Sequence, residues 1–476
     1  MKKQIYNPYL PSWEYIPDGE PRVFDGRVYV FGSHDRFNGY AFCLNDYVCW
    51  SAPEDDLTQW RYEGVIYRRG QDPRNPEGEH IFQAPDVVKG PDGRYYLYYV
   101  MGGFSVVSVA VCDEPAGQYE FYGYVHHSDG TLLGERAGDS PQFDPGVLVE
   151  GENIYLYTGF CAPRDKKAEG ASVTVLEPDM LTVKGASRIV APGVNTAKGT
   201  SFEGHEFFEA SSIRKVNEKY YFIYSSVLYH ELCYAVSDSP LGGFEWKGVL
   251  VSNNDIGISS WKPAEKPMFY GGNNHGSIAE INGKWYIFYH RQTNGTSYSR
   301  QGCAELLPMN SDGSFEQAEM TSCGLNGGPL EGKGEYPAYI ACCLFCPTEE
   351  AYSAPPGEWM DARFPKITQD GKDGDQVDGY IANMKTGATA GFKYFDCCGI
   401  KRITIRTRGF AEGRFLVKTK WDGKVLGGID IHISDEWKAW TGDVTLPDGV
   451  NALFFEYDGM GNPSLALFEL EQETKI

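Results

Sequence analysis

Five polar side chains recur along the chain, each at a similar distance ahead of an aromatic segment. Four are acidic and one is a histidine, and each lies nine to eleven residues before the first aromatic residue of a short apolar run. Carboxyl groups that meet in one pocket can exchange protons with a bound substrate, which is the chemistry of general acid–base catalysis. The five residues are Asp18, Asp86, Asp144, Glu209 and His275.

The stretches around these residues read as pairs of short strands. Residues 15–35, 80–100, 140–160, 206–226 and 271–291 share one pattern, in which apolar and polar positions alternate and a polar or glycine turn separates two runs. Alternation with a period of two and turns of this kind predict β-hairpins. The five copies begin 58 to 68 residues apart, which indicates an internal repeat.

Repeated hairpins fit an all-β fold, a five-bladed β-propeller, in which four-stranded sheets surround a central channel. We expect this domain to span residues 1–345. The residue that opens the innermost strand of each blade would lie at one mouth of the channel, so the four acids and the histidine would converge there. The alternative is that each acid only caps a turn through its own side chain.

The charge balance argues against a polyanionic partner. The 476 residues include 65 acidic and 43 basic side chains, which gives a formal net charge of −22. Nucleic acids and anionic membrane surfaces are bound by clusters of Lys and Arg. We therefore expect neither nucleic acid nor a membrane as partner, and a neutral ligand fits better.

Targeting signals and disulfides are not expected. The first residues contain two lysines but no apolar segment behind them, which predicts no signal peptide and a cytoplasmic protein. The twelve cysteines include two adjacent pairs and show no recurring zinc spacing. We expect reduced, mostly buried thiols.

The five motifs together resemble glycoside hydrolase family 43. The matching segments, in chain order, are "PDGEPRVFDGRVYVFGSHD", "QAPDVVKGPDGRYYLYY", "DPGVLVEGENIYLYTG", "FFEASSIRKVNEKYYFIYSS" and "NNHGSIAEINGKWYIFYHR". The resemblance covers about residues 1–345 and implies a five-bladed propeller with three carboxylates in the catalytic site. Ser211 and Ser212 stand where the family usually has other residues after the glutamate.

The resemblance implies a role for three of the acids. Glu209 corresponds to the general acid and Asp18 to the general base, with Glu20 as the alternative base. Asp86 corresponds to the carboxylate that orients Glu209 and raises its pKa. Inversion needs the acid and the base about 6.5–9.5 Å apart, so that a water molecule fits opposite the leaving group. Asp144 is interpreted as a structural carboxylate outside this set.

Further residues are candidates for binding. Relatives often have a histidine at the fifth mouth position beside a calcium ion held largely by water, so His275 is the predicted metal residue and calcium the predicted cofactor. Arg291 and Arg300 could donate to sugar hydroxyl groups, with surface ion pairing as the alternative. Aromatic candidates for stacking on a sugar, each also a candidate core residue, are Phe31, Phe208 and Trp261.

Residues 346–476 do not share the repeated pattern of the propeller segments. Residues 346–358 are rich in Pro and polar residues and predict a linker, and residues 359–476 alternate in short strands that predict a β-sandwich. This part resembles carbohydrate-binding module family 6, although it could be structural. Possible sugar platforms, which could equally be core residues, are Tyr380, Trp421, Trp437 and Trp440.

The sequence therefore predicts an inverting, exo-acting glycosidase. Its expected substrates are oligosaccharides that end in α-L-arabinofuranosyl or β-D-xylosyl units, because these two pentoses present similar hydroxyl groups. One alternative is a non-catalytic glycan-binding protein. Another is a retaining propeller hydrolase acting on fructosides, from which "PDGEP" departs. The oligomeric state is not predicted.

Overall fold

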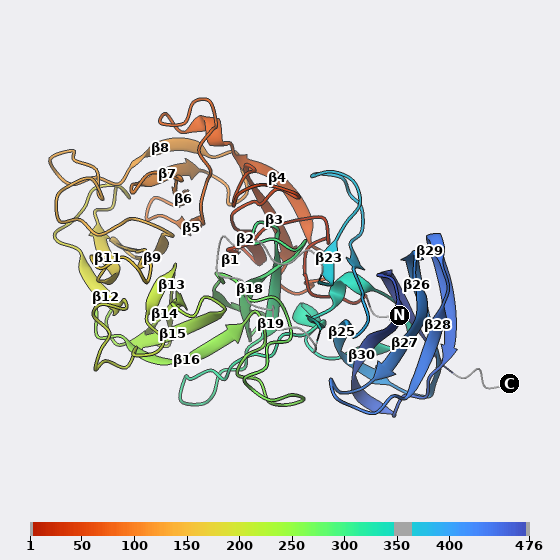
Figure 1. Ribbon diagram of the computed structural model, residues 1–476. Coiled ribbons are helices and arrows are strands. Elements are labelled where there is room, and N and C mark those ends of the chain that lie inside the picture. Colours follow the sequence, from red (N-terminus) through yellow and green to blue (C-terminus); the bar gives the residue numbers. More distant parts are fainter. Residues whose placement is uncertain (1–2, 347–363, 473–476) are drawn as a thin grey trace.

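The computed structural model describes residues 3–346 and 364–472, and its regular structure is almost entirely β-strand. A ring of small sheets lies on the left of Figure 1 and a two-layer sandwich on the right. The order of the sheets confirms the predicted five-bladed propeller followed by a β-sandwich. Among the residues described, no helix is long and apolar enough to cross a membrane.

The propeller blades are antiparallel sheets whose strands follow one another in chain order. Four blades have four strands each, and the fifth has three within the described ranges. The blades contain, in turn, β1 (Glu20–Phe24), β2 (Arg27–Phe31), β3 (Tyr47–Pro53) and β4 (Arg61–Tyr67); β5 (Asp86–Lys89), β6 (Tyr95–Val100), β7 (Val107–Cys112) and β8 (Glu120–Tyr124); β9 (Gly146–Glu150), β10 (Asn153–Thr158), β11 (Gly170–Leu176) and β12 (Arg188–Pro192); β13 (Phe207–Val216), β14 (Lys219–Ser226), β15 (Glu231–Ser237) and β16 (Glu245–Ser252); and β17 (Ile278–Ile281), β18 (Lys284–Gln292) and β19 (Arg300–Leu306).

Tight turns set the register of the inner strands. Three of the five inner hairpins turn through two residues with left-handed backbone: Asp25-Gly26, Asn217-Glu218 and Asn282-Gly283. Turns of this kind match the twist of the strands that they join. Alternate residues of β2 then face opposite neighbours, so that Val28 and Val30 pack toward blade 5, whereas Tyr29 and Phe31 pack toward blade 2. Phe31 is fully buried there, so the prediction that it contacts sugar is wrong.

The first strand of each blade borders the channel. β1 contacts β5 and β17, and β9 contacts β5 and β13, so these strands form the inner wall of the ring. Blades 1 and 5 meet where Gly19 bridges Gly276, and a Cβ atom on Gly276 would lie 1.9 Å from the carbonyl oxygen of Phe288. The residues just before these inner strands therefore gather at one end of the channel.

Within the described residues, the sandwich consists of two six-stranded sheets. The first sheet contains β20 (Leu330–Gly332), β22 (Cys343–Phe345), β25 (Thr389–Cys397), β27 (Glu412–Lys418), β28 (Gly427–Ile431) and β30 (Gly449–Met460). The second contains β21 (Gly334–Pro337), β23 (Lys366–Thr368), β24 (Tyr380–Ala382), β26 (Ile400–Gly409), β29 (Ser434–Asp443) and β31 (Ser464–Gln472). The described part of the chain also contains three short 3₁₀ helices, η1 (Arg69–Gln71), η2 (Gly324–Asn326) and η3 (Ala338–Ile340).

The sandwich begins earlier along the chain than the sequence predicts. β20, β21 and β22 precede the expected boundary at residue 345, yet they pair with β25 and β31 of the sandwich. They are too short for their apolar pattern to reveal which domain they join. The predicted linker, residues 346–358, lies outside the described residues except for Cys346.

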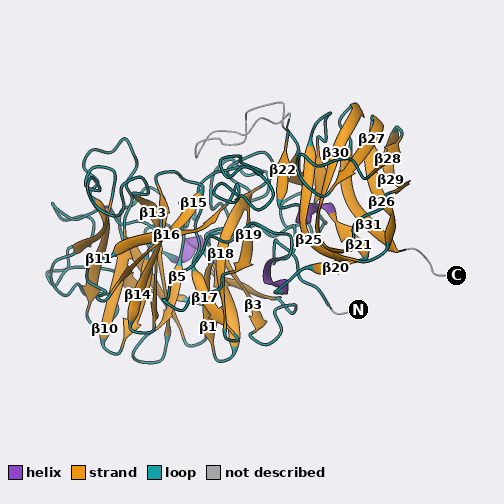
Figure 2. Ribbon diagram, turned by 90° about the horizontal axis from the view of Figure 1, so that it is seen from below, coloured by secondary structure: helices purple, strands orange, loops and turns teal. Residues whose placement is uncertain are grey.

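The two domains share one continuous core, and Figure 2 shows them side by side. Trp261 of the propeller packs on Phe454 of the sandwich with ring centroids 5.0 Å apart, so it lies in the interface and does not stack on sugar. The buried Lys393 reaches across from β25 and donates to Asp255 and Glu319, both at 2.8 Å. Removing one partner of such a buried ion pair leaves the other charge uncompensated, which strongly destabilises the fold.

Candidate active site

A cavity of about 300 Å³ lies at the end of the channel where the inner strands begin. Its walls combine charged groups with aromatic rings, the composition typical of a site for a small ligand. The charged and titratable lining residues are Asp18, Asp144, Glu209, His275 and Arg300, and the others are Phe42, Cys43, Ile81, Gln83, Ala84, Phe143, Phe160, Phe208 and Asn273.

Asp18 is held as an anion. It precedes β1 in left-handed backbone (φ 58°) and is 5% exposed. Arg300 Nη1 donates to Oδ1 of Asp18 at 2.9 Å, and the backbone N–H of Asp18 donates to Nδ1 of His290 at 3.3 Å. Burial opposes ionisation, but the charge of Arg300 and the contact with His290 outweigh it and hold the pKa of Asp18 well below its usual range.

Glu209 is held as a neutral acid. It lies in β13 where the register with β14 shifts, and the next residue, Ala210, has left-handed backbone (φ 67°). Burial and the charge of Asp18 raise the pKa of Glu209 to about 8. The same site therefore pushes the pKa values of two carboxyl groups apart, which is the arrangement that assigns acid and base roles.

Asp144 is the third carboxyl group of the cavity. It precedes β9 in left-handed backbone (φ 44°), and its Oδ2 accepts a hydrogen bond from the N–H of Ala210 at 3.1 Å. Burial, Glu209 and Asp18 together raise its pKa well above the usual range. Asp144 thus supports the backbone that presents Glu209. Because the two carboxyl groups interact, they lose their protons as a coupled pair.

Asp86 lies outside the cavity, so its predicted contact with Glu209 is not made. It is fully buried in β5, where Arg22 donates to both of its carboxylate oxygens and the N–H of Val147 donates to Oδ2 at 2.8 Å. Glu20 is buried in the same way, with Nη2 of Arg214 at 2.7 Å from its Oε2. These two ion pairs form a layer below the cavity, within the channel.

The spacing to the aromatic strand separates the two layers. Asp18, Asp144 and Glu209 each lie eleven residues before their first aromatic residue, whereas Asp86 and Glu20 lie nine before theirs. In blade 2 the position at eleven is Ala84, and this residue lines the cavity. A difference of two residues moves a side chain one step along the same face of a strand. The interval of eleven residues is therefore the sequence signal that distinguishes Asp144, in the cavity, from Asp86.

Of the two predicted arginines, only Arg300 lies in the cavity. Arg291 is 1% exposed and donates to the carbonyl oxygens of Tyr339 and Ala341, both at 2.7 Å, so it supports the start of the sandwich. Arg300 also binds both oxygens of Asp35, through Nε at 2.8 Å and Nη2 at 3.0 Å.

Among the aromatic candidates, Phe208 does line the cavity. The other aromatic lining residues, Phe42, Phe143 and Phe160, are not among the sequence candidates, although Phe143 directly precedes Asp144 as Phe208 precedes Glu209. Phe160 contacts two of the other rings, because its centroid lies 4.9 Å from that of Phe143 and 5.3 Å from that of Phe208.

The proposed sugar platforms of the sandwich divide into two kinds. Tyr380 and Trp437 contact each other at 5.3 Å and line a hollow of about 380 Å³, where Arg408 lies over both rings. Trp421 and Trp440 pack instead against the core. Whether any of them binds sugar stays a prediction.

His275 lies beside the carboxylates with a neutral imidazole. Its Nδ1 lies 3.5 Å from Oδ2 of Asp144 and 4.0 Å from Oδ1 of Asp18. Burial lowers its pKa to about 4, so the ring keeps a free lone pair at neutral pH. These groups do not form a closed metal cage among the residues described, but they fit a calcium ion held by one imidazole and otherwise by water, because the anionic carboxylate of Asp18 lies nearby and supplies negative charge.

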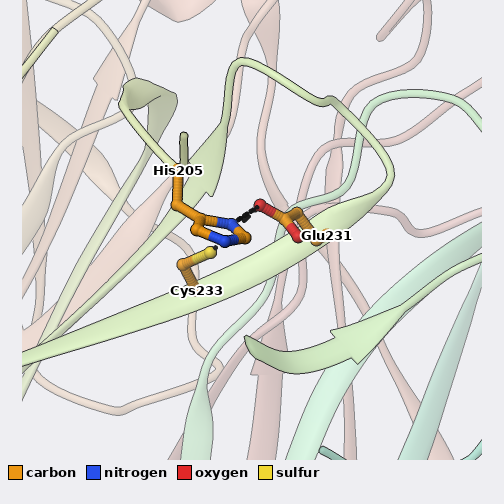
Figure 3. Close-up of side chains that lie close together, drawn as sticks. All are labelled: His205, Glu231 and Cys233. Carbon is orange, nitrogen blue, oxygen red and sulfur yellow. Dashed lines mark hydrogen bonds and ion pairs between the residues drawn. The ribbon is translucent and has the colours of Figure 1, made fainter. Parts of the chain in front are cut away.

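The described residues contain one compact group of metal-ligating side chains, His205, Glu231 and Cys233 at the cavity end of blade 4 (Figure 3). Glu231 Oε1 accepts from His205 Nδ1 at 2.6 Å, from Ser226 Oγ at 2.6 Å and from Cys233 Sγ at 3.4 Å. One oxygen with three donors is a satisfied buried acceptor. The group is best explained as a hydrogen-bond network that fixes the strand ends near Glu209.

Comparison with known proteins agrees with this geometry. The family model described as "Glycosyl hydrolases family 43" matches residues 18–315. A "Xylosidase/arabinosidase" of Thermoclostridium stercorarium is 65% identical over 470 residues, which is 99% of each chain. A protein of the same name from Bacteroides ovatus is 29% identical over 59% of this chain and 87% of its own.

Solved structures show the same fold. An arabinoxylan arabinofuranohydrolase of family 43 from Bacillus subtilis superposes with a TM-score of 0.52 at 20% identity, over 98% of this chain and 97% of its own. A β-xylosidase/α-arabinofuranosidase from a compost metagenome, described as a calcium-free form, has a TM-score of 0.51 at 25% identity, over 65% of this chain and 96% of its own. The family match over most of the propeller and the long close relative lead to one conclusion: this chain is a glycosidase that belongs to glycoside hydrolase family 43.

Proposed function

We propose that the protein removes terminal α-L-arabinofuranosyl or β-D-xylosyl units from oligosaccharides by inversion, with Glu209 as general acid and Asp18 as general base. The observation that carries this proposal is the opposite shift of two carboxyl groups in one cavity: the pKa of Asp18 is lowered while that of Glu209 is raised to about 8. The relative that is 65% identical carries the name "Xylosidase/arabinosidase", which supports the pentose specificity.

The shape of the cavity supports exo action. Its volume of about 300 Å³ lies at the small end of ligand sites, which hold roughly 300–1,000 Å³. Beyond it, the buried Arg22–Asp86 and Arg214–Glu20 ion pairs lie within the channel. A cavity of this size fits one terminal sugar unit, whereas a long chain would need an extended groove.

The reaction follows from the protonation states. Asp18, ionised beside Arg300, accepts a proton from a water molecule as that water attacks the anomeric carbon. Glu209, protonated at neutral pH, gives its proton to the leaving oxygen on the opposite face of the sugar. One product sugar and one shortened oligosaccharide result, with the anomeric configuration inverted.

Asp144 takes the supporting role in this proposal, in place of Asp86. Its carboxyl group anchors the N–H of Ala210 and so fixes the backbone next to Glu209. Positioning of this kind matters because a displacement of about 1 Å at the reacting group costs roughly a hundredfold in rate. Phe143, Phe160 and Phe208 form an apolar wall against which a sugar ring can pack.

Calcium is proposed as a supporting ion. When bound, it would supply positive charge that steadies the carboxylates of the cavity, held by His275 and water. The neutral imidazole and the anionic Asp18 near it support this assignment. The reacting groups remain Asp18 and Glu209.

Replacing Glu209 with alanine should make turnover depend on the leaving group. For a xylo-oligosaccharide, whose leaving oxygen needs a proton, we expect kcat/KM to fall by about 10²–10⁴. For a dinitrophenyl xyloside, which departs without a proton, the loss should be much smaller. Steady-state kinetics on both substrates checks this, with Glu203→Ala, an exposed acid nearby, as the control that leaves both unchanged. Equal losses on the two substrates would rule out the acid role.

The pH profile of kcat/KM should have an alkaline limb near pH 8. Glu209 must carry its proton to act, and its pKa is raised to about 8, so activity is retained below this pH and falls about tenfold for each further unit above it. Initial rates on a xylo-oligosaccharide between pH 5 and pH 10 measure the limb. An unchanged rate up to pH 10, or a limb near pH 5, would be incompatible with a protonated Glu209.

Removal of calcium should weaken the protein in a way that depends on His275. We expect dialysis against a chelator to lower both the melting temperature and the activity, and added Ca²⁺ to restore them. At 100 times its Kd, a bound ion raises the free energy of unfolding by about 2.7 kcal/mol. In His275→Ala this calcium response should be lost. Metal-free protein with unaltered melting and activity would remove calcium from the proposal.

A further inference from the structure

One wall of the cavity is a loop without regular structure, residues 34–45, here named the wall loop. Phe42 and Cys43 line the cavity from this loop. The loop also reaches the charged centre, because Asp35 binds Arg300 and accepts a hydrogen bond from the N–H of Cys43 at 2.9 Å. The conformation of the loop therefore determines where Phe42 and Cys43 lie in the cavity. It also determines the position of Arg300, which contacts Asp18.

The wall loop is strained and needs support from outside. Two of its residues that are not glycine, Asn38 and Cys43, have left-handed backbone, with φ of 58° and 56°. Such conformations cost free energy and persist only where surrounding contacts determine them. Hydrogen bonds from Arg36 to Asn45 and Leu44, and from Asn45 to the carbonyl oxygens of His34 and Asp35, join the two ends of the loop, so its middle depends on contacts with other segments.

The support comes from the sandwich domain. Asp373, on the segment between β23 and β24, accepts a hydrogen bond from the N–H of Phe37 through Oδ1 at 2.7 Å. Its Oδ2 accepts from Nδ2 of Asn45 at 3.0 Å. One carboxylate therefore bridges the two halves of the wall loop, and hydrogen bonds to a charged group are stronger than neutral ones.

A second set of contacts joins the same two segments. Asn294 of the propeller donates through Nδ2 to Oδ1 of Asn38 at 2.8 Å, and its backbone N–H donates to the carbonyl oxygen of Ile367 at 2.7 Å. Thr368 Oγ1 donates to Oδ1 of Asn294 at 2.8 Å. The sandwich segment 366–373 thus touches the wall loop both directly and through Asn294.

The domain that carries this segment is firmly docked. The Lys393 contacts with Asp255 and Glu319, and the packing of Trp261 on Phe454, are buried interface contacts. Domains joined by a substantial apolar interface do not move freely against each other. The segment can therefore act as a fixed anchor for the loop.

We propose that the sandwich domain is part of the sugar-binding machinery of the propeller, with Asp373 as a positioning residue that holds the wall loop against the cavity. Asp373 does not line the cavity and acts through Phe37 and Asn45. This inference rests on the proposed function, because it assigns the domain a role in binding the terminal pentose.

Asp373→Ala in the full chain tests the proposal. We expect KM for a nitrophenyl pentoside to rise about tenfold, the equivalent of one lost charge-assisted hydrogen bond, with kcat changed less than about twofold. Hydrogen exchange should speed up in residues 34–45. Asp373→Asn keeps one acceptor oxygen and should recover part of the affinity. The control is Asp370→Ala, which removes an acid of the same segment whose partners, Tyr380 and Arg408, lie within the sandwich.

The outcomes separate this inference from the function on which it rests. If Asp373→Ala leaves KM and exchange in the wall loop unaltered, or if Asp370→Ala raises KM equally, the positioning role is wrong. Faster exchange with an unchanged KM would also overturn it, because the loop would then not matter for binding. If the wild-type protein turns over no pentoside although the exchange differs between the variants, the proposed function fails instead.

Discussion

The contact between Arg300 and Asp18 governs the electrostatics of the cavity. Both groups are buried, and a carboxylate in such a place would otherwise take up a proton. With Arg300 at 2.9 Å, Asp18 stays charged, and its charge in turn helps to keep Glu209 protonated. Removing the arginine would therefore alter the protonation of the base and of the acid together. The site depends on this one buried cation more than on any single carboxylate.

Most of the fold and part of the site could be predicted from the sequence. The repeat of hairpins predicted five blades, and the acids before the inner strands predicted a shared mouth, because strand periodicity is a local property that residues report directly. Asp86 is misassigned from the sequence because its motif resembles the family's, although it lies only nine residues before its aromatic strand. Phe208 is a sequence candidate, but Phe42 and Asp35 could not be predicted, since loop residues meet only through tertiary packing.

The same reasoning explains the misplaced domain boundary and the role of the sandwich. Short strands such as β20 and β22 carry too few residues to show their partner sheet. Arg291 and Trp261 are candidate sugar-binding residues in the sequence, yet together with Lys393 they bind the two domains together. A chain of hydrogen bonds and ion pairs thus runs from Asp373 of the sandwich through the wall loop to Arg300, and links the second domain to the charge balance of the cavity.

The central claim is that the carboxyl groups at the interval of eleven residues form the reacting layer, whereas those at nine form a structural layer beneath it. Comparing Asp144→Asn with Asp86→Asn tests this most directly. We expect the first to lower kcat by about a hundredfold with little change in stability. The second should lower the free energy of unfolding by about 3–5 kcal/mol, while the folded fraction keeps near-normal kcat. The reverse pattern, with Asp86 controlling kcat and Asp144 only stability, would contradict the account.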